Sequence, residues 1–171
     1  HIPEDRHKRG LILDYTMEDN MVLKVYKNKP FSKNGLINRS KITEYANNII
    51  ETFDVRSGEG GKSIARSLSG GNQQKGVIGR EIQSSPDLLI AVQPTRGLDV
   101  GSIEYIHKRL VEQRDSGKAV LLVSLELDEI LNVSDRIAVV NNGELIGIVN
   151  ASETDENEVG LMMAGIKRGE S

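Results

Sequence analysis

The spacing of apolar residues divides the chain into a helical first half and a second half in which strands alternate with helices. After Ser40, a predicted N-cap, apolar side chains recur every three or four residues and predict an amphipathic helix. The segment 72–83 predicts a second helix, which ends before Pro86 because the residue preceding a proline disfavours helix. Residues 1–35 mix charges with glycine and proline, and predict loops with short helical turns at 16–26.

Beyond Pro86 the pattern changes to short, continuous apolar runs. Runs at 87–92 and 119–124 predict buried strands, and the helix predicted between them spans 102–116 and ends at Gly117. This order of strand, helix and strand implies a parallel sheet. The further predicted elements are a helix at 127–131, strands at 136–140 and 144–149 joined by the hairpin turn Asn141-Asn142-Gly143, and a last helix from Thr154 or Ser152 to about Ala164.

Composition narrows the classes of protein to which the chain can belong. Its 171 residues include 22 Lys plus Arg against 25 Asp plus Glu, so no global field attracts nucleic acid or anionic lipid. The absence of cysteine excludes disulfides and thiolate metal sites, and no apolar run approaches the roughly 20 residues of a membrane-spanning helix. His1, His7 and His107 lack metal-ligand spacing and are expected to be solvated. We therefore expect a soluble, cytosolic chain, and its opening without Met indicates a piece of a longer protein.

Two motifs point to phosphate chemistry. The first is Leu68, the Ser-Gly-Gly turn (Ser69-Gly70-Gly71), then Asn72, Gln73 and a predicted helix. Backbone N–H groups, a hydroxyl and the positive end of a helix dipole suit an anion such as the γ-phosphate of ATP. The second is the segment 93–99, Gln-Pro-Thr-Arg-Gly-Leu-Asp, which directly follows an apolar strand. A phosphate loop of the form Gly-x-x-x-x-Gly-Lys-Ser/Thr does not occur in the sequence, and the nearest imitation, at 58–63, is interpreted as a loop.

With these motifs the chain resembles the ATP-binding subunits of ABC transporters for simple sugars and nucleosides, which carry two cassettes in one polypeptide. Segments typical of that group are Pro3-Glu4-Asp5-Arg6, Asn72-Gln73-Gln74-Lys75 and Pro94-Thr95-Arg96-Gly97-Leu98-Asp99. The resemblance spans nearly the whole chain and matches the C-terminal half of the second cassette. Residues 7–11 and 123–127 look closest to the nucleoside-uptake branch.

The fold implied by the resemblance is α/β, an incomplete P-loop NTPase (ABC ATPase) core with an α-helical subdomain. Residues 1–85 would hold the remnant of the γ-phosphate-sensing loop and the helical subdomain with its signature motif, and 86–171 the C-terminal part of the core. In the family, the strand that leads to the phosphate loop lies between those at 119–124 and 136–140. Its absence would leave unpaired strand edges, through which the isolated piece is expected to self-associate.

Several positions that carry catalysis in the family hold unsuitable residues here. Val92 stands where an Asp orders the Mg²⁺ shell, and Gln93 stands at the position of the catalytic Glu. Valine cannot order water around a metal, and a neutral amide cannot accept a proton from the attacking water. Leu125 falls at the switch His, and Glu4 replaces the Gln of the γ-phosphate-sensing loop, where it could still ligate Mg²⁺. The resemblance thus implies a degenerate site in this half and no intact catalytic residue.

The resemblance also implies ligands and partners. ATP and Mg²⁺ would bind the full-length protein, and the piece alone, without a phosphate loop, would be inactive and bind neither firmly. The binding positions are Leu68, Ser69, Gly70, Gly71, Asn72, Gln73, Glu4 and, at the dimer interface, Asp99. The turn would complete the ATP site of the first cassette of the same polypeptide. The other implied partners are transmembrane permease subunits and, indirectly, a solute-binding protein, at the cytoplasmic face of a bacterial membrane, with no nucleic acid.

Two alternatives remain open. One is a soluble regulatory or structural member of the superfamily, such as a ribosome-associated or chromosome-organising ATPase. The segments at 4–6 and 72–75 disfavour it, and so does the absence of coiled-coil heptads. The other is a pseudo-cassette that never binds nucleotide and docks on a membrane partner.

Overall fold

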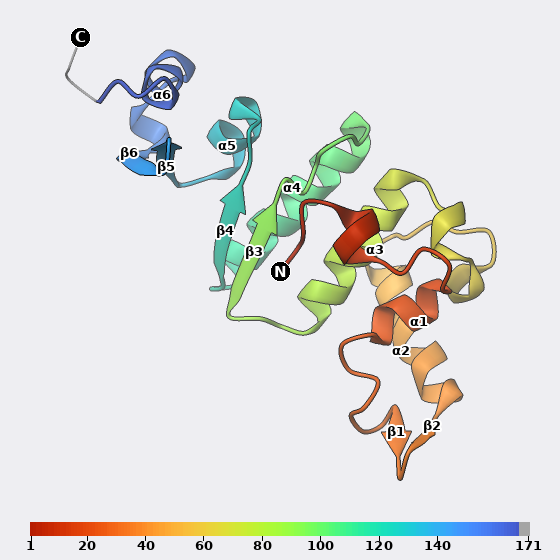
Figure 1. Ribbon diagram of the computed structural model, residues 1–171. Helices are drawn as coiled ribbons and strands as arrows, with labels where there is room; N and C mark the ends of the chain where they lie inside the picture. The colour runs from red at the N-terminus through yellow and green to blue at the C-terminus, as the bar shows by residue number, and fades with distance from the viewer. Residues whose placement is uncertain (168–171) are drawn as a thin grey trace. The chain divides into compact units, whose positions relative to one another are not determined.

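The computed structural model describes residues 1–167 (Figure 1). The chain divides into two units, His1–Leu121 and Leu122–Ser171, each with its own buried side chains. The sequence predicted a boundary near Pro86, between a helical subdomain and a nucleotide-binding core. That boundary refers to the parts of a complete cassette, and it stays a prediction. None of the described helices is long and apolar enough to cross a membrane.

Three helices of the first unit pack against one another, and each begins at a polar cap. The second of them starts two residues earlier than predicted: Asn38, not Ser40, is the N-cap, and its side-chain oxygen accepts a hydrogen bond from Lys41 N. An asparagine caps at least as well as a serine, and Asn38 follows directly on a strand that holds the entering chain. The third starts at Gly70, so that the two glycines of the Ser-Gly-Gly turn are its first helical residues. The helices are α1 (Met17–Val22), α2 (Arg39–Thr52) and α3 (Gly70–Gln83).

These helices share one apolar core. On the face of α3 that meets α2, a Cβ placed on Gly79 would lie 2.9 Å from both Ile49 Cγ2 and the Phe53 ring, so only glycine allows this close approach. Side chains from all three helices fill the core: Met17, Met21, Ile42, Ala46, Ile49, Val77 and Ile78. The predicted helix at 72–83 and the helical turn within 16–26 are thereby confirmed.

Short elements connect the helices. A π-helical turn, η1 (Arg6–Gly10), follows the first strand-like residues. A two-stranded hairpin, β1 (Ser32–Lys33) and β2 (Leu36–Ile37), precedes α2. The hairpin lies in a stretch predicted as loop, although Asn34-Gly35 at its tip is a common hairpin turn and both residues have positive φ angles. Two 3₁₀ turns, η2 (Gly60–Lys62) and η3 (Ala65–Ser67), lead into α3.

The sheet of the first unit is formed by β3 (Leu88–Val92) and β4 (Ala119–Val123), and helix α4 (Val100–Asp115) connects them. The two arrows point the same way, as predicted for a parallel pair (Figure 1). Ile2 occupies the other edge of β3, where its amide donates to Ile90 O at 2.7 Å and its carbonyl accepts from Val92 N at 3.0 Å.

The prediction that both strands are buried is wrong for β4. Leu121 and Val123 expose 51% and 45% of their surfaces. Within the described chain β4 pairs with β3 alone, so its second edge has no neighbouring strand to cover it. The core of the sheet is therefore incomplete.

The second unit contains a hairpin covered by helices. Strands β5 (Arg136–Asn141) and β6 (Glu144–Asn150) pair antiparallel through the predicted turn, in which Asn142 and Gly143 have φ angles of 47° and 83°. The cap of the last helix was predicted at Thr154 or Ser152 and is Asp155, whose carboxylate accepts from Glu158 N at 2.8 Å. The unit's helical elements are α5 (Leu127–Val133), η4 (Ala151–Glu153) and α6 (Glu156–Met163), and its core contains Ile137, Val139, Val149, Val159 and Met162.

Candidate functional site

The Ser-Gly-Gly turn forms the amino end of α3. Leu68 is buried and anchors the turn, while Ser69 is exposed in an extended conformation as the N-cap. Ser69 Oγ accepts hydrogen bonds from Asn72 Nδ2 at 2.9 Å and, over a long 3.4 Å, from Asn72 N. The first N–H groups of a helix lack partners within the helix, and they stand at the positive end of its dipole. The turn therefore has the groups that bind an anion.

Both glycines of the turn are closely covered by side chains from other segments. A Cβ on Gly70 would lie 2.8 Å from Arg6 Nη2, and a Cβ on Gly71 would overlap Ser102 Oγ. The turn is thus held between the segment around Arg6 and the first turn of α4. Larger residues would have to displace these neighbours.

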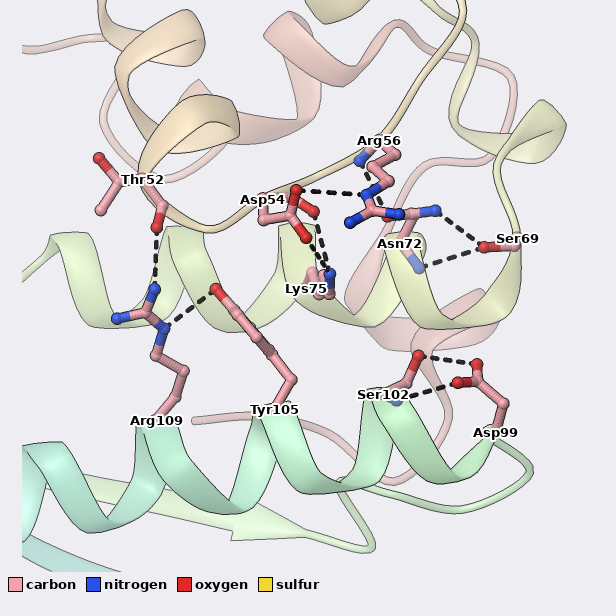
Figure 2. A network of polar contacts seen from close by, with 10 residues as sticks. All are labelled: Thr52, Asp54, Arg56, Ser69, Asn72, Lys75, Asp99, Ser102, Tyr105 and Arg109. Atoms are coloured by element: carbon pink, nitrogen blue, oxygen red, sulfur yellow. Dashed lines mark hydrogen bonds and ion pairs between the residues drawn. The ribbon is translucent and has the colours of Figure 1, made fainter.

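Asp99 is the N-cap of α4 and lies beside the turn (Figure 2). Its Oδ2 accepts from the Ser102 hydroxyl at 2.7 Å, and its Oδ1 accepts from Ser102 N at 2.9 Å. The hydrogen bonds from the Ser102 hydroxyl and amide lower the pKa of Asp99 below its usual 3.8. A carboxylate that stays ionised is consequently fixed next to the amino end of α3.

A second polar network holds α3 from the other side (Figure 2). Arg56 N donates to Asn72 Oδ1 at 2.8 Å, and the Lys75 ammonium donates to Asp54 Oδ2 at 2.8 Å. Hydrogen bonds from Lys75 and Arg56 lower the pKa of Asp54. Lys75 also lies 4.5 Å from the centroid of the Tyr105 ring, and this cation–π contact links α3 to α4.

The opening segment of the chain contacts the turn as well. Glu4 Oε1 forms an ion pair with Arg96 Nη1 at 2.6 Å, and Arg6 Nη1 donates to Arg96 O at 3.3 Å. Arg6 Nε is buried and has no hydrogen-bond partner within residues 1–167. His7 is exposed, as predicted, but its Nε2 also lies 2.8 Å from Gln73 Oε1. The carboxylate of Glu4 is thus engaged with a cation on the loop that follows β3.

The predicted binding residues divide into two groups. Ser69, Gly70, Gly71 and Asn72 gather at the amino end of α3, where Ser69 is exposed and Gly71 is buried, and Asp99 lies beside them. Gln73 is buried and donates through Nε2 to Ala65 O at 3.0 Å, so its amide anchors the turn to η3 instead of facing solvent.

Val92 and Gln93, at the end of β3, offer neither a carboxylate nor another group that binds Mg²⁺ strongly. Gln93 has a φ of 48°, and the carbonyl of the next residue, Pro94, accepts a hydrogen bond from Gln74 Nε2 at 2.7 Å. No group of three His, Asp or Glu side chains with metal-binding geometry occurs among residues 1–167. Leu125 lies in the second unit and exposes 77% of its surface. The residues present therefore suit a phosphate at the turn and do not suit Mg²⁺ at Val92 and Gln93.

Sequence reasoning missed several residues that shape this site. Arg6, Arg56 and Ser102 contact the turn or Asn72 from segments that are distant in sequence. Only Ser102 had a local signal, because an Asp three residues before a Ser is a common helix-capping pattern. Nothing in the sequence indicates that Arg6 packs on Gly70 or that Arg56 reaches Asn72.

Comparison with known proteins shows what the chain is similar to in sequence and in fold. No family model matches the chain. Over 171 residues it is 55% identical to the guanosine import ATP-binding protein NupO of Bacillus subtilis (strain 168), covering 100% of the chain and 33% of the relative. Over 165 residues it is 57% identical to the nucleoside import ATP-binding protein NupA of Lactococcus lactis subsp. cremoris (strain MG1363), covering 96% of the chain and 32% of the relative. The chain spans about a third of the length of these relatives.

Solved structures confirm the predicted fold class. A dimeric ATP-binding cassette in a post-hydrolysis state, bound to ADP and Pi, matches with a TM-score of 0.66 and 24% sequence identity, over 82% of this chain and 59% of that chain. The α/β core with an α-helical subdomain is thus the fold of an ATP-binding cassette, with part of the core lacking.

Proposed function

Because this chain belongs to the ATP-binding cassette (ABC) family, we propose that it acts within the ATP-binding subunit of an importer of nucleosides or simple sugars. Relatives at 55% and 57% identity carry guanosine and nucleoside import in their names, and a ribose import ATP-binding protein of Caldanaerobacter subterraneus is 38% identical over 165 residues. These likenesses favour a nucleoside over a ribose-type sugar. The chain would correspond to the C-terminal half of the second of two cassettes.

In this proposal the Ser-Gly-Gly turn completes the ATP site of the first cassette. The Ser69 hydroxyl and the N–H groups of Gly70 and Gly71 would contact the γ-phosphate, with the dipole of α3 adding attraction. ATP bound there supplies the phosphoryl group that is transferred to water. The protein's part is to hold that group and to stabilise negative charge as it develops, which is where preorganised N–H donors act most strongly.

The site formed by this half itself would bind nucleotide weakly or without turnover. Val92 and Gln93 provide no carboxylate for Mg²⁺ or for the attacking water, and Leu125 cannot hydrogen-bond a phosphate. Glu4 could offer a carboxylate, but its ion pair with Arg96 would have to open first. Hydrolysis is therefore assigned to the first cassette, with Asp99 at the contact between the two sites.

The implied partners follow from the same proposal. The subunit would dock on transmembrane permease subunits at the cytoplasmic face of the bacterial membrane and would receive solute indirectly from a solute-binding protein.

One observation carries the proposal: an exposed Ser69 caps the amino end of α3, while the end of β3 lacks carboxylates. The test is ATP hydrolysis by the complete two-cassette protein with Ser69→Arg, and with Gln93→Ala as the matched variant in the other site. Loss of anion-stabilising donors typically costs about 10²–10³ in kcat, so Ser69→Arg should abolish measurable turnover. Gln93→Ala should change it little, and comparable losses from both variants would contradict the asymmetry.

A pseudo-cassette that only docks on a membrane partner would share the residues at Val92 and Gln93. The same pair of variants separates the two functions. If the chain were only a docking module, Ser69→Arg should leave ATP hydrolysis by the complete protein unchanged.

A further inference from the structure

A basic hairpin segment, residues 24–41, follows α1, includes β1 and β2, and ends in the first turn of α2. It contains six cations, namely Lys24, Lys27, Lys29, Lys33, Arg39 and Lys41, and the sequence has no Asp or Glu from residue 20 to residue 43. This local excess contrasts with the net charge of −3 for the whole chain. Charges beyond about 8–10 Å are screened at physiological ionic strength, so the local charge governs what this segment attracts.

Three of the six cations are committed to the protein itself. Lys24 pairs with Glu81, Arg39 with Asp19 and Lys41 with Glu44. These pairs hold the base of the segment against its neighbours.

The other three, Lys27, Lys29 and Lys33, are exposed, and they form no ion pair with any residue that the structure describes. Lys27 lies over the Tyr26 ring at 5.7 Å from its centroid. Three exposed ammonium groups without a carboxylate partner, Lys33 on β1 and Lys27 and Lys29 just before it in the chain, thus remain available to an anionic partner.

The hairpin also carries exposed apolar side chains beside these lysines. Leu36 exposes 77% and Ile37 49% of its surface, and both belong to β2. Figure 1 shows the hairpin projecting beyond α1 and α2. Its base is anchored, because the Phe31 and Tyr45 rings pack edge to face at 4.9 Å and Asn38 N donates to Phe31 O at 2.8 Å. A fixed projection that carries Leu36 and Ile37 on β2, next to the turn Asn34-Gly35 and to Lys33, can reach an apolar boundary.

We infer that this hairpin docks on an anionic lipid surface. Lys27, Lys29 and Lys33 contact lipid phosphates, while Leu36 and Ile37 enter the boundary between headgroups and acyl chains. Paired apolar and cationic side chains are the composition of segments that bind membrane interfaces. The surface is separate from the Ser-Gly-Gly turn, and the inference does not depend on the proposed function.

Charge alone would also attract nucleic acid, but the hairpin lacks the other features of such a site. Single strands are bound by stacking bases on several aromatic side chains. Tyr26 is the one exposed aromatic residue of this segment, and its ring is already under Lys27. Contact with a phosphate backbone would not bury the exposed Leu36 side chain, whereas a membrane would bury it and so stabilise the bound state.

The experiment is cosedimentation of the 171-residue chain with vesicles of phosphatidylglycerol mixed with phosphatidylcholine, compared with phosphatidylcholine alone. Each lysine near an anionic surface contributes about a fivefold change in partition coefficient, so the triple variant Lys27→Ala/Lys29→Ala/Lys33→Ala should bind roughly a hundredfold more weakly. Leu36→Ser should weaken binding about tenfold at unchanged charge.

The matched control is Lys62→Ala/Lys108→Ala/Lys167→Ala, which removes the same charge from exposed positions outside the hairpin. It should bind like the unmodified chain, and circular dichroism checks that each variant is folded. If the triple hairpin variant fails to fold, Lys33→Ala and Leu36→Ser carry the test singly. Equal binding to both vesicle types, equal loss in the control, or retention by an RNA oligonucleotide but not by anionic vesicles would each overturn the inference.

Discussion

Substituting alanine for Gly71 tests whether this glycine is needed for packing within the protein. A Cβ at this position would overlap Ser102 Oγ and would lie 3.2 Å from Ser102 Cβ and 3.3 Å from Asp99 Oδ2. The shortest of these contacts can be relieved only if the Ser102 hydroxyl rotates away. That rotation breaks its 2.7 Å hydrogen bond to Asp99. The substitution therefore acts on the contact between α3 and α4.

The expected loss of stability is a difference between two effects. Loss of the hydrogen bond costs about 1 kcal/mol, and crowding against Ser102 Cβ and Asp99 costs about 1–2 kcal/mol more. Alanine recovers up to about 1 kcal/mol, because it favours helix over glycine. Gly71→Ala should thus lower the free energy of unfolding by about 1–3 kcal/mol.

Urea unfolding followed by far-UV circular dichroism measures this change. Gly101→Ala is the matched control, since a Cβ there would meet only Asp99 Oδ1, at an ordinary 3.5 Å, and should leave stability equal or slightly raised. Ser102→Ala removes the overlapped atom, so the double variant with Gly71→Ala should lose about 1 kcal/mol less than the sum of the single losses. A Gly71→Ala protein as stable as Gly101→Ala, or strictly additive losses, would refute the packing argument.

Two further predictions concern residues that hold α3 in place. Burial raises the pKa of Glu81, but the hydrogen bond from Lys24 and the charge of Arg80 outweigh burial, so that its pKa is lowered from 4.5. Because the folded-state pKa of Glu81 is lowered, its ionised carboxylate stabilises the fold above pH 4.5, and this stabilisation is lost as the pH falls through the folded-state pKa. Glu81→Gln should therefore reduce the free energy of unfolding at neutral pH and make it depend less on pH in the acid range. An unchanged pH profile in urea unfolding would contradict this. Asn72→Ala removes the acceptor for Arg56 N and should cost about 1 kcal/mol in the same assay, whereas Asn72→Asp keeps the acceptor and should cost less; equal losses would argue against the contact.

The sequence predicted the regular elements well where a local signal decides the structure. The turn at Asn142 and Gly143 and the helix at 72–83 follow from chemistry within a few residues. Two caps were misplaced by one or two residues, at Asn38 and at Asp155, because several neighbouring residues there are good caps and only the path of the entering chain chooses among them.

Features that depend on contacts between segments distant in sequence could not be predicted. An apolar run such as 119–123 predicts a buried strand, yet its burial depends on a neighbouring strand that the described chain does not supply. In the same way, the contact of Arg6 with Gly70 and the hydrogen bond from Arg56 to Asn72 join residues far apart in sequence. The motif indicated which residues stand at the amino end of α3, whereas the groups that position them became visible only in three dimensions.

The two helix ends that meet at the site are capped differently, and this decides which of them is available to a ligand. The carboxylate of Asp99 neutralises the amino end of α4 through two short hydrogen bonds with Ser102. Ser69 is uncharged and accepts from Asn72 N only over 3.4 Å, so the partial positive charge at the amino end of α3 is left unneutralised by its cap. The cap therefore leaves the amino end of α3 less neutralised than that of α4, but the Asp99 carboxylate lies close to both, since a Cβ on Gly71 would be 3.3 Å from its Oδ2. A phosphate at the Ser-Gly-Gly turn, as proposed above, would have to be held by the α3 end against the repulsion of this carboxylate.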